Sequence, residues 1–164
     1  MKHTIMKLIV LRAGFLTSVQ DLGRTGFRQF GVSTSGALDC FALRVANLLV
    51  GNDEGGAGLE VTLGGLSLRF EDERMVAWCG GEFDVQIGSR SLPAGHVAHL
   101  RPGDELKFAR AQMGCACGLA LSGGGEVRVL RDGSSLDLGA HFGGVGGGAA
   151  GLGCLAGWAW PGWG

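Results

Sequence analysis

The stretch Phe83-Asp84-Val85-Gln86-Ile87-Gly88-Ser89-Arg90-Ser91-Leu92 decides the fold class. Apolar and polar residues alternate from Phe83 to Ile87, which is typical of a strand with one buried face. Gly88-Ser89 then predicts the turn of a hairpin that returns through residues 90–92. This part of the chain is therefore expected to form antiparallel strands.

Similar short apolar runs lie on both sides of this hairpin. Each is bounded by Gly, Pro or Asp residues, which favour turns. The further predicted strands are residues 5–11, 59–63, 66–70, 75–79, 97–100, 105–108, 119–121 and 126–130. We therefore predict a mostly β protein.

Residues 37–50 are different, because their apolar positions recur at the spacing of a helix. One arc of that helix is apolar and is predicted to face the core: Leu38, Phe41, Ala42, Val45, Ala46, Leu48 and Leu49. Asp39, Arg44 and Asn47 lie on the opposite arc, where Leu43 is an apolar exception. Ser35 is the expected N-cap, Asp39 suits the positive end of the helix, and Gly51-Asn52 suits its stop. Many strands and one capped helix predict a closed or nearly closed β-barrel, with the helix plugging one end.

Composition excludes several classes of function. The chain has 164 residues, of which 46% are hydrophobic, so a single domain with a sizeable core is expected. A net charge of −1 argues against a nucleic-acid partner. Before Asp137 no uncharged run is long enough to span a membrane, so no membrane partner is expected. Residues 5–11 lack a cleavage signature and are interpreted as a first strand, not a signal peptide.

The five cysteines show no repeated spacing and are expected to be reduced, mostly buried thiols of a cytoplasmic protein. Cys115-x-Cys117 and His96-x-x-His99 do not complete a tetrahedral ligand set, so no structural metal is predicted.

Two polar segments could carry chemistry. Gln20, Asp21 and Arg24 place an amide, a carboxylate and a guanidinium beside glycines, where backbone can approach a ligand closely. The alternative is an Asp21–Arg24 pair that only pins a turn. Residues 30–39 lead into the helix, and their backbone N–H groups would either bind an anion or serve simple capping. The chain has no Gly-Lys-Ser/Thr phosphate loop.

Five strings together resemble one known family. They are LTSVQDLGRTG at 16–26, FGV at 30–32, SGALD at 35–39, ALRVANLLVGN at 42–52 and LEVTL at 59–63. The run resembles the biotin-dependent carboxyltransferase family. That family includes the 5-oxoprolinase C subunit, is also labelled allophanate hydrolase subunit 2, and covers part of the carboxyltransferase domain of urea carboxylase. The resemblance implies a cyclophilin-like β-barrel with one helix over residues 1–131, as the N-terminal half of a longer protein.

Residues 132–164 depart from the pattern of that family. Ser134 and Gly148 stand where the family has arginines, and no residue after Asp137 is formally charged. We expect this Gly-rich segment to be a degraded or truncated start of the second half, and to be disordered. A frameshift would explain it, and a natural short variant is the alternative.

The resemblance also implies a function. It implies a cytoplasmic hydrolase subunit of an ATP-dependent 5-oxoprolinase, which opens 5-oxoproline to glutamate together with partner proteins similar to the B and A subunits of that enzyme. ATP would be used by the complex and not bound through a phosphate loop of this chain. The alternative is a carboxyltransferase-type component of urea carboxylase or allophanate metabolism, with carboxybiotin on a separate carrier. A regulatory binding protein and an inactive fragment are further alternatives.

For the two enzymatic readings, six residues are expected to serve a small amide substrate. Gln20, Asp21 and Arg24 would act as the catalytic group in contact with it. Ser35 and Asp39 would bind it at the helix start, with Asn47 in support.

Overall fold

The computed structural model describes residues 6–23, 25–31, 33–122, 133 and 135–138. This part of the chain contains α1 (Cys40–Leu49), a short 3-10 helix, η1 (Arg28–Phe30), and eleven strands. The strands are β1 (Met6–Ala13), β2 (Leu16–Gln20), β3 (Gly58–Thr62), β4 (Leu66–Phe70), β5 (Arg74–Glu82), β6 (Val85–Ile87), β7 (Arg90–Ser91), β8 (Val97–Leu100), β9 (Glu105–Phe108), β10 (Met113–Leu121) and β11 (Ser135–Leu138). None of its helices is long and apolar enough to cross a membrane.

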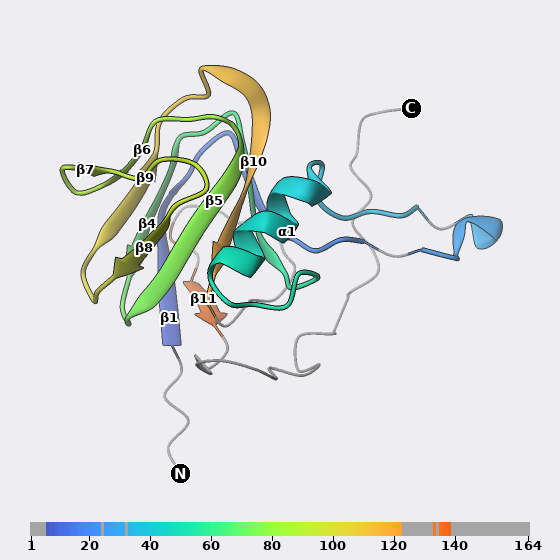
Figure 1. The fold of residues 1–164 in the computed structure, drawn as a ribbon, viewed down its shortest axis with the longest axis horizontal. Coiled ribbons are helices and arrows are strands. Elements are labelled where there is room, and N and C mark those ends of the chain that lie inside the picture. The colour runs from blue at the N-terminus through green and yellow to red at the C-terminus, as the bar shows by residue number, and fades with distance from the viewer. Residues whose placement is uncertain (1–5, 24, 32, 123–132, 134, 139–164) are drawn as a thin grey trace, which may run out of the picture.

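The strands form two antiparallel sheets (Figure 1). The first sheet has the order β11-β1-β4-β9-β6-β7, and the second has the order β2-β3-β10-β5-β8. The predicted hairpin is confirmed as β6 and β7, with Gln86 opposite Ser91 and Ile87 opposite Arg90. The mostly β, barrel-like fold with one helix is therefore confirmed.

The main core lies between the two sheets. It contains fully buried residues from both, such as Leu8 and Leu68 of the first sheet and Val61 and Leu119 of the second. An aromatic group joins them, in which Trp78 meets Phe83 and Phe108 edge to face at centroid distances of 6.1 and 5.9 Å. The indole Nε1 of Trp78 donates to the Leu92 carbonyl at 2.9 Å, so its one polar atom is satisfied inside the core.

The helix α1 lies against the outer face of the second sheet, not at an end of the barrel (Figure 1). There it forms a small separate core, in which Ala46 and Val50 pack on Ala77 and Ala120. Glycine allows this close approach, because a Cβ at Gly118 would lie 3.0 Å from the Leu43 Cα.

The predicted buried face of the helix is confirmed for Ala42 and Ala46 and is wrong for its large residues. The buried residues of α1 are Ala42, Leu43, Ala46 and Asn47, whereas Phe41 and Leu48 are 77% and 59% exposed. Apolar residues occupy both sides of this helix, so their periodicity does not show which side packs. The predicted N-cap is also wrong, because Asp39 occupies that position and accepts a hydrogen bond from Ala42 N at 2.9 Å.

Two strands differ from the sequence-based expectation. β2 is not among the predicted strands, and its buried Thr17 hydroxyl donates to the Ala13 carbonyl at 2.7 Å. β11 falls within the segment 132–164, and it pairs with β1 with Met6 opposite Leu138. The expected strand at 126–130 and the expected disorder from residue 139 onward lie outside the described residues.

Candidate functional site

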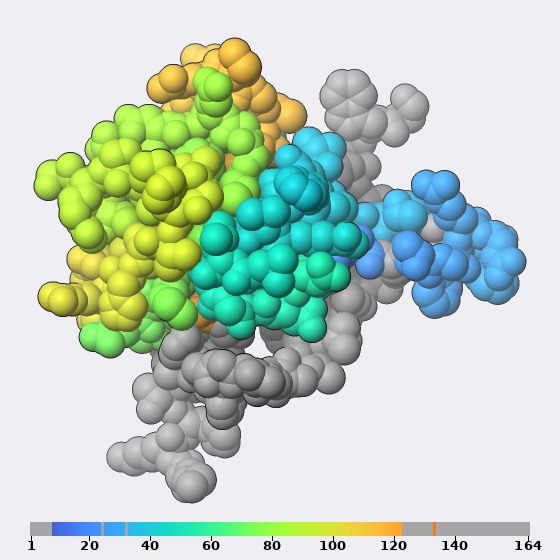
Figure 2. Space-filling model, viewed as in Figure 1, coloured from blue at the N-terminus to red at the C-terminus, as the bar shows by residue number. Residues whose placement is uncertain are grey.

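Residues 21–23, 25–31 and 33–39 form a projecting arm between β2 and α1, here called the arm (Figures 1 and 2). Its two sides are joined at the base, where Ala37 N donates to the Asp21 carbonyl at 2.8 Å. The backbones of Gly23 and Gly36 cross each other there, and both residues have a positive φ, of +74° and +93°. A Cβ on Gly23 would lie 2.4 Å from the Ser35 carbonyl oxygen, so only glycine permits this crossing.

The arm base brings together four of the six predicted site residues. Gln20 ends β2 and Asp21 begins the arm, whereas Ser35 and Asp39 lie on its returning side. The Asp21 Oδ1 atom accepts a hydrogen bond from Gly23 N at 2.7 Å, which shapes the outgoing turn. Ser35 adopts a left-handed conformation with φ 53°, which is uncommon for a residue with a side chain.

The other two predicted residues do not join this group. Arg24 lies outside the described residues. Asn47 lies about 12 Å from Asp39 along the helix axis, since eight residues separate them at about 1.5 Å each. Its Nδ2 donates to the Gly56 carbonyl at 2.6 Å and its Oδ1 accepts from Asn52 at 3.0 Å. Asn47 therefore ties the loop after α1 to the helix, and its role in substrate binding stays a prediction.

A carboxylate that the motif interpretation left unassigned lies beneath the arm base. Glu60 is 4% exposed, and its Oε2 accepts a hydrogen bond from Leu38 N at 2.5 Å. Burial raises the pKa of the Glu60 carboxyl, the N–H groups of Leu38 and Asp39 oppose this rise, and the nearby Asp39 charge adds to it. The signal in the sequence is a charged residue inside an apolar strand, between Leu59 and Val61.

Glu60 belongs to a row of residues that runs across the second sheet. Ser18 pairs with Glu60, Glu60 with Gly118, and Gly118 with Cys79, so these four positions share the face covered by α1. The Gln20 amide Nε2 donates to the Ser18 hydroxyl at 3.0 Å, which links the end of β2 to the row. Burial raises the pKa of the Cys79 thiol, so Cys79 is present here as a neutral group.

The chemistry of this site suits proton exchange and amide recognition. Gln20 offers a donor and an acceptor that match those of a substrate amide. Asp39 and Glu60 are two carboxyl groups of different environment, one exposed and one buried with a raised pKa. Such pairs are suited to separate acid and base roles.

The start of α1 does not suit a phosphate. Of the two possibilities that the sequence left open for this segment, anion binding and simple capping, the structure favours capping. Its N–H groups at Leu38 and Ala42 already donate to the carboxylates of Glu60 and Asp39. A phosphate would have to displace these hydrogen bonds and approach the Asp39 carboxylate, which costs electrostatic free energy. Among the described residues, no group of three or more His, Cys, Asp or Glu is arranged to hold a metal ion.

Comparison with known proteins identifies related sequences. A family model described as carboxyltransferase domain, subdomain A and B, matches residues 30–153. The 5-oxoprolinase C subunit of Escherichia coli is 41% identical over 138 residues, which cover 84% of this chain and 44% of that protein. Urea amidolyase of Saccharomyces cerevisiae is 34% identical over 128 residues, which cover 77% of this chain and 7% of that protein. The chain therefore spans less than half the length of these relatives.

A solved structure shares the fold. The crystal structure of the K. lactis urea amidolyase matches with a TM-score of 0.77 at 31% sequence identity. The match covers 80% of this chain and 9% of that one. The two antiparallel sheets and the single helix are thus an architecture found within a much larger enzyme.

Proposed function

Because this chain belongs to the family of carboxyltransferase domains, subdomain A and B, we propose that it acts as the C subunit of an ATP-dependent 5-oxoprolinase. This cytoplasmic hydrolase would open the lactam ring of 5-oxoproline to glutamate. The observation that carries the proposal is the 41% identity to the 5-oxoprolinase C subunit over 84% of this chain. The identity to urea amidolyase is lower, at 34% over 77% of the chain.

The reaction breaks the C–N bond of the lactam and forms a C–O bond with water. The lactam oxygen must be stabilised as charge develops on it, and the leaving nitrogen must gain a proton. In this proposal Gln20 pairs with the substrate amide, and Asp21 orients its N–H. Asp39 is exposed at the arm base and serves as the group that exchanges a proton with the substrate or with water.

Glu60 acts as a positioning residue in this proposal. It is buried beneath the helix start and holds Leu38 N, so it fixes the neighbouring Asp39 relative to β3. Because the pKa of Glu60 is raised, its carboxyl group retains a proton at higher pH than an exposed glutamate does.

ATP would supply the activation of the lactam carbonyl. The arm base does not fit its phosphates, because the donors there are already bonded to carboxylates. We therefore assign ATP binding to the partners that resemble the B and A subunits, and derive no step through ATP on this chain.

The test is reconstitution of turnover. The full chain is mixed with the A and B subunits of a 5-oxoprolinase, and glutamate formation is measured with 5-oxoproline and ATP. The proposal expects turnover that depends on this chain, and that Asp21→Asn and Asp39→Asn lower by at least about tenfold. Glu54→Gln, an exposed carboxylate outside the site, is the matched control and is expected to leave the rate unchanged.

Three other outcomes would replace this proposal. Urea-dependent turnover with a carboxybiotin carrier would favour a role in urea carboxylase, the alternative supported by the structural match to urea amidolyase. Binding to the partner proteins without turnover would indicate a regulatory binding protein. Neither binding nor turnover would indicate an inactive fragment.

A further inference from the structure

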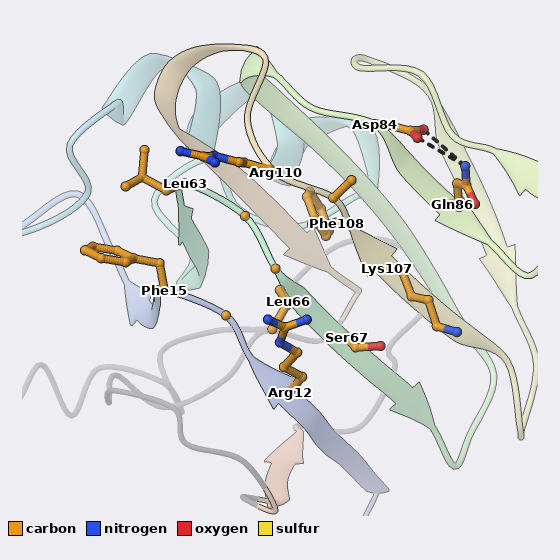
Figure 3. A pocket seen from close by; sticks show the side chains of 14 residues that line it. Arg12, Phe15, Leu63, Leu66, Ser67, Asp84, Gln86, Lys107, Phe108 and Arg110 are labelled. Atoms are coloured by element: carbon orange, nitrogen blue, oxygen red, sulfur yellow. Dashed lines mark hydrogen bonds between the residues drawn. The ribbon is translucent and has the colours of Figure 1, made fainter.

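A second concave site lies on the first sheet, away from the arm base (Figure 3). It is a cleft of about 930 Å³ at the corner where β1 turns into β2, whereas Gln20 lies at the other end of β2. The volume is within the range of small-molecule sites, which is roughly 300–1,000 Å³. Its lining includes Arg12, Phe15, Ser67, Lys107 and Arg110.

The register of the strands aligns four polar side chains across the floor of this cleft. Arg12 of β1 pairs with Ser67 of β4, Ser67 pairs with Lys107 of β9, and Lys107 pairs with Gln86 of β6. Paired residues point to the same face of a sheet, and neighbouring strands lie about 4.8 Å apart. The Ser67 hydroxyl therefore lies between two cationic side chains, as Figure 3 shows.

A β-bulge places Arg12 in this row. The register of β1 against β4 shifts between Val10 and Arg12, so Leu11 is the extra residue. Without the bulge, Leu11 would stand opposite Ser67. Bulges of this kind re-aim a side chain and are over-represented next to active sites.

The wall of the cleft is built from closely packed glycine backbone. Gly14 meets the loop between β3 and β4, where a Cβ on Gly14 would lie 2.4 Å from the Gly64 carbonyl oxygen. Leu63 precedes Gly64 and Gly65 in that loop and has φ 57°. A left-handed conformation is strained for leucine, and such strain clusters at ligand sites.

The charge of the cleft is positive. Arg12, Lys107 and Arg110 line it together with one carboxylate, Asp84, which accepts hydrogen bonds from a neighbouring glutamine amide. Lys107 is held by Glu105 at 3.0 Å. No salt bridge within the described part of the chain involves Arg12 or Arg110, and the three cations that line the cleft outnumber its one carboxylate.

We propose that this cleft is a second ligand site, which binds a small organic oxyanion through Arg12, Ser67 and Lys107. The anionic group is a carboxylate or a phosphate, because guanidinium, hydroxyl and ammonium donors suit both. The exposed Phe15 ring and Leu63 flank Arg110 at the other end of the cleft and contact an apolar or planar part of the ligand. Ligand binding in this cleft does not depend on the proposed hydrolysis, because binding requires no turnover.

The experiment is a titration of the full chain at low ionic strength, followed by amide chemical shifts. Benzoate and phenyl phosphate carry the two candidate anions on the same ring, benzamide lacks the charge, and inorganic phosphate lacks the ring. We expect benzoate or phenyl phosphate to shift the amide resonances of residues 12, 64–67 and 107–110. The probe that binds more tightly identifies the preferred anion. Benzamide is expected to bind at least about tenfold more weakly, as is expected when a charge-assisted hydrogen bond is lost.

Substitutions then locate the binding. Arg12→Gln and, separately, Lys107→Gln are each expected to weaken binding about tenfold, and either variant suffices should the other fail to fold. Arg44→Gln removes the same charge from the exposed side of α1 and is expected to leave affinity unchanged. The proposal is overturned if no anionic probe shifts these residues, or if the two cleft variants bind as tightly as Arg44→Gln.

Discussion

At Glu60, two effects act on one carboxyl group in opposite directions. Burial disfavours the charged form, whereas hydrogen bonds from backbone N–H groups favour it. The effect of burial is the larger one, so the pKa of Glu60 is raised. The folded chain therefore holds this proton more tightly than the unfolded chain does. Its contribution to stability is complete below the ordinary value of 4.5 and is lost as the pH rises through the folded-state pKa.

Glu60→Gln is expected to remove this pH dependence. Glutamine keeps an oxygen that can accept from Leu38 N but carries no charge to bury. The melting temperature of the variant should equal that of the parent chain at pH 4 and exceed it increasingly toward pH 8. Thermal unfolding followed by circular dichroism at several pH values measures this, with Glu54→Gln as the exposed control. A variant that is less stable than the parent at pH 8 would show that the negative charge is stabilising.

The polar residues grouped at the surface could be predicted from the sequence better than the contacts of buried polar residues. Gln20, Asp21, Ser35 and Asp39 form polar strings and do lie together at the arm base. Glu60 was missed because a single acid inside an apolar strand does not reveal which backbone groups will cover it. The structural bonds of Asn47 could not be predicted from the sequence, because they depend on the loop that folds back onto the helix end.

At the scale of elements, the arm depends on the crossing of Gly23 and Gly36. Gly36→Ala would place a Cβ 2.5 Å from Gly23 N, whereas Gly26→Ala has the same left-handed strain and nothing within 4 Å. The first variant should therefore open the arm base and the second should not. The difference is read from hydrogen exchange of Ala37 N, which bonds to the Asp21 carbonyl. Equal loss of protection in both variants would mean that conformational strain alone, and not contact, controls the base.

The ends of several strands could be predicted from turn residues. The side of the helix that packs on the sheet could not be predicted from its apolar pattern. β4, β8 and β9 match their predicted ranges because glycine, proline and aspartate end them. In α1, small residues such as Ala46 lie against the sheet, and large ones such as Phe41 face outward. Gly58 and Gly118 leave room beneath the helix for the buried Leu43, and this information lies on strands distant in the sequence.

At the scale of the whole molecule, the outer side of α1 leaves a large apolar surface exposed. Leu38, Phe41 and Leu48 are 68%, 77% and 59% exposed. Exposed large apolar side chains promote association when they lie near one another on a surface. We expect the isolated chain to self-associate in a concentration-dependent manner, and Phe41→Glu with Leu48→Glu to reduce this without lowering the melting temperature.

Light scattering over a concentration series measures this effect. Met113→Glu adds a charge at another exposed apolar residue, on β10, and serves as the control. The role of the helix surface would be contradicted if the control reduced association as much as the double variant does.

The pairing of β11 with β1 also governs the order in which the chain can fold during its synthesis. β1 has β4 on one edge, and residues 135–138 pair with its other edge. Until those residues leave the ribosome, a newly made chain presents an open strand edge, which other strands can pair with. This pairing joins two segments that are far apart in the sequence, a slow type of contact because the intervening loop must first be closed.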